Sequence, residues 1–198
     1  MVTEIELKAH VQDSEALKTI LSRKAELGGA FEKRDVYWFG AEASGLLVTK
    51  LRVRKEKRSF ADGTEKSLCL VTYKAKEENN GIEINEELEF EVSPAEEFEE
   101  FLKKAGLREG AVKRKHGWVF SKAEITAELV EVDGLGWFIE LEILANADDK
   151  REETLKGARE SLLAFLDSLG VEREAIERRF YLDMLSSIEY RQLNADDR

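Results

Sequence analysis

The sequence predicts an α+β fold made mainly of antiparallel strands. About eight segments show the alternating apolar and polar pattern of half-buried strands, and turn signals such as Asn79-Asn80-Gly81 separate neighbouring segments. Helical segments interrupt runs of strands and do not follow each strand, as they would in a parallel sheet. Eight strands can also close into a barrel that is wide enough for one small ligand.

The first half of the chain is expected to contain one helix among five strands. Asp13 is a suitable N-cap for this helix, and Gly28-Gly29 is expected to end it. Turn residues at Ala61-Asp62-Gly63 separate two of the strands. The expected strands cover residues 2–11, 31–39, 46–56, 67–77 and 82–92, and the expected helix covers residues 13–27.

The second half is expected to begin with a helix at Ser93-Pro94-Ala95-Glu96. Here Ser93 would be the N-cap, Pro94 the first helical residue and Glu96 the partner that completes a capping box, and Gly106 would end the helix. Strands are then expected at 110–120, 123–133 and 137–145, and helices at 149–169 and 172–187. We expect one domain over residues 1–190 and a frayed tail over 191–198.

The composition narrows the class of protein. A length of 198 residues suits one substantial domain, and the net charge of −11 argues against general nucleic-acid binding, which needs a cationic face. The single cysteine, Cys69, excludes an internal disulfide and suits a reducing compartment. No apolar run approaches the ~18 residues of a membrane span. We therefore expect a cytoplasmic protein without a membrane or nucleic-acid partner.

Charged residues alternate with apolar residues along most of the expected strands. In the first strand Glu4, Glu6 and Lys8 share one face, and Ile5 and Leu7 share the other. Later strands carry either basic or acidic sets on one face. The basic sets are Lys50, Arg52 and Arg54; Lys74 and Lys76 with Thr72; and Lys113 with Lys115. The acidic sets are Glu83, Glu87, Glu89 and Glu91, with Asn85 among them on the same face, and Glu140 with Glu142.

Two structures are compatible with this alternation. An open sheet could expose its charged side to water and form cross-strand ion pairs. A closed sheet would line a tunnel with both kinds of charge, so that cations bind a polyanion while carboxylates hold divalent metal ions against it. A triphosphate would suit such a tunnel.

Several short motifs resemble those of the CYTH domain, the triphosphate tunnel metalloenzymes, and their order covers nearly the whole chain. Glu4-Ile5-Glu6-Leu7-Lys8 resembles the E-x-E-x-K signature of the family's first strand. The segment from Gly134 to Glu142, GLGWFIELE, resembles the family's G-L-G-x-F-x-E-x-E. The other matching segments are Asp35-Val36-Tyr37, Leu51-Arg52-Val53-Arg54, Thr72-Tyr73-Lys74, Glu87-Leu88-Glu89, Lys113-Arg114-Lys115 and Phe180-Tyr181-Leu182-Asp183-Met184-Leu185.

The resemblance implies an eight-stranded antiparallel β-barrel, a triphosphate tunnel, with flanking helices. It implies Mg²⁺ or Mn²⁺ as cofactor, held by Glu4, Glu6, Glu140 and Glu142. Lys8 and Glu140 would be catalytic. The substrate-binding residues would be Arg52, Arg54, Lys74, Lys113, Lys115, Glu87 and Glu89.

The activity that the resemblance implies first is that of a class IV adenylyl cyclase, which converts ATP to cyclic AMP and pyrophosphate. The alternatives are a triphosphatase, acting on thiamine triphosphate, a nucleoside triphosphate or tripolyphosphate, and a nucleotide- or polyphosphate-binding module without catalysis. A homodimer through uncovered apolar strand faces is a further expectation.

One position departs from the family pattern. Val130 stands where the family usually has an Asp, four residues before the G-L-G turn. Glu128 has the same facing parity as Val130, so it could reach the metal from one step down the strand. Alternatively, one of the metal sites is weakened.

Overall fold

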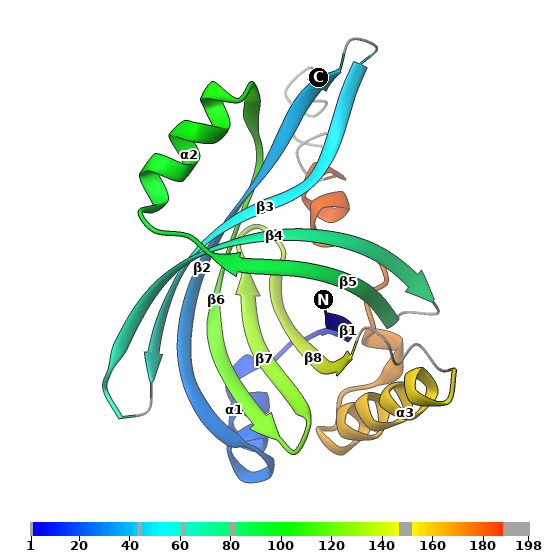
Figure 1. Cartoon of the computed structure of the whole chain (residues 1–198). Coiled ribbons are helices and arrows are strands. Elements are labelled where there is room, and N and C mark those ends of the chain that lie inside the picture. The colour runs from blue at the N-terminus through cyan, green and yellow to red at the C-terminus, as the bar shows by residue number, and fades with distance from the viewer. Residues whose placement is uncertain (1, 43–44, 61, 80–81, 147–151, 188–198) are drawn as a thin grey trace, which may run out of the picture.

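The computed structural model describes residues 2–42, 45–60, 62–79, 82–146 and 152–187, and within these ranges the strands form a closed antiparallel barrel (Figure 1). The eight strands are β1 (Val2–His10), β2 (Glu26–Glu42), β3 (Gly45–Phe60), β4 (Glu65–Asn79), β5 (Ile82–Glu91), β6 (Leu107–Lys122), β7 (Ile125–Val132) and β8 (Gly136–Asn146). Their order around the barrel is β1-β5-β4-β3-β2-β6-β7-β8, and β1 closes the ring by pairing with β5 and β8. The predicted barrel is confirmed, and the open sheet is excluded.

The first helix ends earlier than predicted. Helix α1 (Ser14–Lys24) starts after Asp13, whose side chain accepts a hydrogen bond from the Ala16 N–H as expected. Gly28-Gly29 does not end this helix but lies inside β2. A Cβ on Gly29 would lie 2.2 Å from the Ser59 carbonyl oxygen, so glycine is needed for the close approach of β2 to β3.

The predicted capping box before the second helix is wrong. Helix α2 (Ala95–Lys104) has Pro94 as its N-cap and no side-chain capping bond, so Ser93 lies one residue outside the helix. The Glu96 carboxylate is instead 3.2 Å from the Lys55 ammonium group on β3. Gly106 ends the helix with φ +87°, as predicted.

The last predicted helix is only half correct. Helix α3 (Glu152–Ser168) is followed by a short 3₁₀ turn, η1 (Arg173–Ala175), and residues 181–187 are helical. Between them, Ile176 forms a bridge with Ala9, and the Glu177 N–H donates to the Lys8 carbonyl at 2.9 Å. Docking of this segment on β1 replaces the predicted continuous helix. The predicted tail lies outside the described residues.

The helices cover two separate parts of the barrel's outer surface. α1 packs against β2 and β6, and α3 packs against β1 and β8, with Leu21, Leu162 and Leu166 fully buried in one cluster. α2 packs over β2, β3, β4 and β6 through Leu102. None of the helices in the described ranges has the length and apolar character needed to cross a bilayer.

The outer face of β4 and β5 keeps an apolar surface exposed. Tyr73 and Leu88 are partners across these strands, and each is 51% exposed. Phe90 on β5 is 50% exposed. Such a surface is compatible with the expected homodimer, which stays a prediction.

One end of the barrel interior is filled by apolar side chains. They come from the inner faces of β2, β7 and β8 and from the helical residues 181–187. This apolar plug consists of Phe31, Val130, Val132, Phe138, Tyr181 and Met184. The plug lies against the polar cavity, because Phe31 and Tyr181 also line that cavity.

Candidate functional site

The inner faces of the strands enclose a cavity of about 850 Å³ that is lined largely by charged side chains. This volume lies within the usual range for small-molecule sites. The predicted site residues that line it are Glu4, Glu6, Arg52, Arg54, Glu87, Glu89, Lys113, Lys115, Glu140 and Glu142. β1 and β2 stand on opposite sides of the ring, so the charges of these two strands face each other across the cavity.

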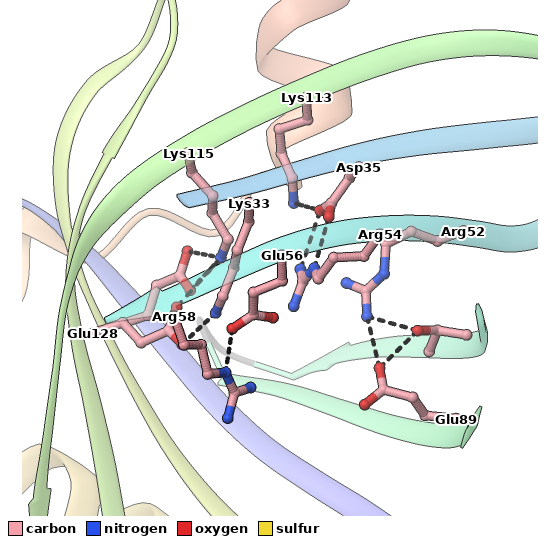
Figure 2. A network of polar contacts seen from close by, with 12 residues as sticks. Lys33, Asp35, Arg52, Arg54, Glu56, Arg58, Glu89, Lys113, Lys115 and Glu128 are labelled. Atoms are coloured by element: carbon pink, nitrogen blue, oxygen red, sulfur yellow. Dashed lines mark hydrogen bonds and ion pairs between the residues drawn. The ribbon is translucent and has the colours of Figure 1, made fainter. Parts of the chain in front are cut away.

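Asp35 organises the cations on the β2 side. The Arg54 guanidinium donates from Nε and Nη2 to the two Asp35 oxygens at 2.7 and 3.1 Å, and Lys113 Nζ is 3.1 Å from Asp35 Oδ2 (Figure 2). Burial alone would raise the Asp35 pKa, but Arg54 and Lys113 hold it well below its usual value. Asp35 therefore stays ionised and fixes the directions of both cations.

Two lysines beside this group are also paired with carboxylates. Lys115 donates to both oxygens of Glu140 at 3.0 and 2.7 Å, and Lys33 lies 2.5 Å from Glu128 (Figure 2). Burial lowers the Lys33 pKa, whereas for Lys115 the charges of Glu140 and Glu128 outweigh burial and raise the pKa. We call Lys33, Asp35, Arg54, Lys113 and Lys115 the basic wall.

Arg52 extends the cationic surface toward β4 and β5. Its Nη2 donates to the Thr72 hydroxyl at 2.9 Å and to Glu89 at 3.4 Å, and Thr72 donates to the same Glu89 oxygen at 2.7 Å. The Lys74 backbone pairs with Glu87 across these strands, but the Lys74 side chain lies outside the described residues. Arg52 is thus held in place from two sides.

Carboxylates gather on the other side of the cavity. Glu6 and Glu142 are direct partners across β1 and β8, and Glu4 lies two residues from Glu6 on the same face. Burial, followed by the charges of Glu4 and Glu6, raises the Glu142 pKa to about 9. We call Glu4, Glu6 and Glu142 the acidic wall. Lys8, two residues from Glu6 on β1, is buried and paired with Glu83, and it is not among the residues that line the cavity.

The acidic wall fits a divalent cation. Carboxylate oxygens are the ligands that Mg²⁺ and Mn²⁺ prefer, and a cation would relieve the repulsion that raises the Glu142 pKa. Within the described residues, no group of three or more acidic, His or Cys side chains is already arranged around one metal-sized centre. Binding would therefore draw these carboxylates closer together.

The structure explains the departure at Val130. Its side chain is fully buried in the apolar plug, where an ionised Asp would have little water. Glu128 lies one step along β7, lines the cavity and is the direct partner of Glu140 on β8. A carboxylate pair is thus present near the position that the family motif predicts.

Sequence reasoning missed several cavity residues that are not in the family motifs. Lys33, Glu56 and Arg58 share the facing parity of Asp35 or Arg54, so alternation alone could have identified them. Glu56 pairs with Arg58 at 2.5 Å (Figure 2). No local signal could have shown that Lys33 would meet Glu128.

Tyr181 reaches the cavity from the last helix. Its ring centroid lies 5.1 Å from Lys113 Nζ and 5.5 Å from Lys8 Nζ, within the range of cation–π attraction. Burial, and then the charge of Glu140, raises the pKa of its hydroxyl well above the usual value. Tyr181 therefore stays neutral between the apolar plug and the charged walls.

Comparison with known proteins agrees with this geometry. The CYTH domain family model matches residues 3–181. A Methanocaldococcus jannaschii protein named as a candidate adenylate cyclase is 26% identical over 186 residues, which cover 91% of this chain and 97% of the relative.

Solved structures share the fold. A Pyrococcus horikoshii protein has a TM-score of 0.74 and 26% identity, with 93% of this chain and 98% of that chain covered. A Hippeastrum protein, described as a candidate adenylyl cyclase with a dominant triphosphatase activity, has a TM-score of 0.62 and 19% identity, with 94% and 96% covered. The chain belongs to the CYTH domain family of triphosphate-binding proteins, which generally use a divalent metal.

Proposed function

We propose that this protein is a metal-dependent enzyme that converts ATP to cyclic AMP and pyrophosphate inside the barrel. The observation that carries the proposal is the placement of the basic wall and the acidic wall around one cavity of about 850 Å³. Such a site can bind the phosphates of a nucleotide on one side and their metal ions on the other. The name of the Methanocaldococcus jannaschii relative supports the cyclase assignment.

The basic wall would bind the phosphate oxygens. Arg54 and Lys113 are already oriented by Asp35, so these two cations need little reorganisation when the substrate arrives. Lys8 on β1 approaches this wall through the Tyr181 ring, whose centroid lies 5.5 Å from Lys8 Nζ and 5.1 Å from Lys113 Nζ, and it would add charge near the phosphates. In cyclisation, a bond forms between the ribose 3′-oxygen and the α-phosphorus, and the bond to the leaving pyrophosphate breaks.

The acidic wall would hold one divalent cation, and Glu140 with Glu128 would hold a second. Glu128 and Glu140 are direct partners on neighbouring strands, so both carboxylates are available from one side of the cavity. When bound, the metal would neutralise phosphate charge and lower the pKa of the attacking hydroxyl. Cation binding at Glu128 and Glu140 would release Lys33 and Lys115 toward the phosphates.

A second candidate activity is hydrolysis of a triphosphate. The described triphosphatase activity of the Hippeastrum protein favours it, and the same phosphate contacts would serve a water molecule as nucleophile. The substrate could be a nucleoside triphosphate, thiamine triphosphate or tripolyphosphate. A binding module without turnover is the third candidate, and it is favoured by the absence of the family's usual Asp at Val130.

The decisive experiment is incubation of the purified protein with ATP and either Mg²⁺ or Mn²⁺. Cyclic AMP with pyrophosphate would support the cyclase, whereas ADP with phosphate would support hydrolysis. If neither product forms at high protein concentration although ATP and metal stabilise the protein, the result would support the binding module. A parallel screen of thiamine triphosphate and tripolyphosphate would identify the substrate class.

Two neighbouring residues of β6 provide a matched control. Lys113 lies buried in the basic wall, whereas the adjacent Arg114 is exposed on the outer face. Lys113→Gln should lower kcat/KM roughly 10- to 100-fold, because a charge-assisted phosphate contact is lost. Arg114→Gln removes the same charge from the protein and should leave kcat/KM unchanged.

A further inference from the structure

We infer that Asn85 is a positioning residue for the metal-binding carboxylates, which it serves by orienting Glu4. This inference rests on the proposed metal site and deepens it. Asn85 belongs to none of the sequence motifs that pointed to the site. It lies on β5, which is the neighbour of β1 in the barrel.

The first observation is the contact between Asn85 and Glu4. The two residues are direct partners across β5 and β1, and the Asn85 side-chain amide donates to Glu4 Oε2 at 3.0 Å. Asn85 is fully buried and Glu4 is partly buried, so this contact is partly shielded from water. A hydrogen bond of this kind fixes the plane of the carboxylate and determines which oxygen remains turned toward a ligand.

The second observation concerns the other end of the same amide. The Asn85 Oδ1 atom is buried and has no hydrogen-bond partner. Buried polar atoms in native proteins are rarely left unpaired, and those without a protein partner commonly contact a bound water or ion. An amide oxygen is also a suitable ligand for a divalent cation or for one of its bound waters.

The charge of the neighbourhood explains why an amide stands here. Glu4, Glu6 and Glu142 already crowd one another, and a further carboxylate at position 85 would add to that repulsion. An apolar residue would satisfy the packing but would leave Glu4 without its donor. Asparagine supplies both a donor for Glu4 and a neutral oxygen for the cation side.

The test measures Mn²⁺ binding and metal-free stability in the same variants. Asn85→Leu keeps the volume but removes both polar groups, and loss of a supporting contact of this kind typically weakens metal binding by roughly 10- to 100-fold. Isothermal titration with Mn²⁺ should show this loss, whereas the metal-free melting temperature should not fall. Asn85→Ala, with the same expected weakening, replaces the leucine variant if that variant does not fold.

Thr3→Val is the matched control. Thr3 is the residue before Glu4, is 1% exposed and likewise has a hydroxyl without a hydrogen-bond partner, but it lies on the other face of β1. Its substitution should leave Mn²⁺ affinity unchanged.

The outcomes separate this inference from the proposed function. Unchanged Mn²⁺ affinity in the Asn85 variants, or a weakening matched by Thr3→Val, would overturn the role of Asn85 and leave the metal site standing. If the unaltered protein takes up no Mn²⁺ at all, the metal site and the role of Asn85 are both wrong.

Discussion

The two charged walls of the cavity differ in how their charges are balanced. In the basic wall, Arg54 and Lys113 share Asp35. Lys33 pairs with Glu128, and Lys115 pairs with Glu140 and, at 3.7 Å, with Glu128. In the acidic wall, by contrast, Glu6 faces Glu142 directly, and the mutual charge contributes to a Glu142 pKa of about 9. The basic wall is therefore held in place by its own counterions, whereas the acidic wall, when no cation is bound, lowers its charge by keeping Glu142 protonated at neutral pH.

This difference has a functional consequence. Paired cations keep their geometry without a ligand, which lowers the reorganisation needed to bind phosphate. Crowded carboxylates cost the metal-free protein stability, part of which protonation of Glu142 recovers, and a bound cation would take the place of that proton. The comparison predicts that substitutions in the two walls will have opposite effects on metal-free stability.

The largest effect is expected in the basic wall. Asp35→Asn takes the carboxylate partner away from the buried Lys113 and the largely buried Arg54, which should cost about 3–5 kcal/mol of the free energy of unfolding. Urea denaturation measures this loss. Glu131→Gln, which removes a partly exposed partner of His116, is the control and should change stability by less than about 0.5 kcal/mol. A similarly small loss in Asp35→Asn would mean that the basic wall is not held by its counterion.

The next effect concerns the apolar plug beside the two walls. Val130→Asp restores the family's usual residue but buries a carboxylate against Phe138 and Met184, so it should destabilise the protein by about 3 kcal/mol. We expect no gain in turnover of ATP. Enhanced turnover in a stable variant would show instead that the unaltered protein lacks one metal ligand. Glu128 would then not be the residue that replaces the family's usual Asp.

In the acidic wall, a smaller effect of the opposite sign is expected. Glu142→Gln replaces a carboxyl group that is already protonated at neutral pH with a neutral amide, so metal-free stability should stay equal or rise. Mn²⁺ at 100 times its Kd stabilises a binding-competent protein by about 2.7 kcal/mol, and most of this gain should be lost in the variant. Thermal unfolding with and without Mn²⁺ gives both values. A large metal-free loss of stability would contradict the contrast between the walls.

The smallest effect is the pH dependence that Asp35 confers. Its pKa lies well below the usual value in the folded protein and near about 3.9 in the unfolded chain. The contribution of Asp35 to the free energy of unfolding is therefore complete above about pH 4. It is lost as the pH falls toward the folded-state pKa, at up to about 1.4 kcal/mol per pH unit. Urea midpoints at pH 5, 4 and 3 should fall less steeply for Asp35→Asn. Parallel curves would assign the acid sensitivity to other carboxylates.

Local sequence patterns predicted most of the strands and failed where long-range contacts decide. Gly28-Gly29 has the composition of a helix end, but the approach of β3 uses Gly29 inside a strand. Ser93 and Glu96 have the residue types of a capping box, but the Glu96 carboxylate pairs with Lys55 on β3, which the local sequence could not indicate. The expected helix at 172–187 is interrupted because Ile176 bridges to Ala9 on β1.

The candidate site was predictable to a similar extent. Alternation identified the inner faces of the strands, and the motifs identified residues such as Arg54 and Glu140. Lys33 and Asn85 were missed as site residues, because their importance depends on partners on other strands. Glu128 lies 95 residues from Lys33 along the chain, and Glu4 lies 81 residues from Asn85.

The sequence by itself determined the family and which side of each strand is charged, because side chains alternate in any strand and this periodicity is written locally. Only the tertiary structure decided which carboxylate neutralises which cation, that Val130 lies in an apolar plug, and that Glu4, Glu6 and Glu142 crowd one another. These features depend on the register between strands and on closure of the barrel, and both bring together residues that are far apart in the chain.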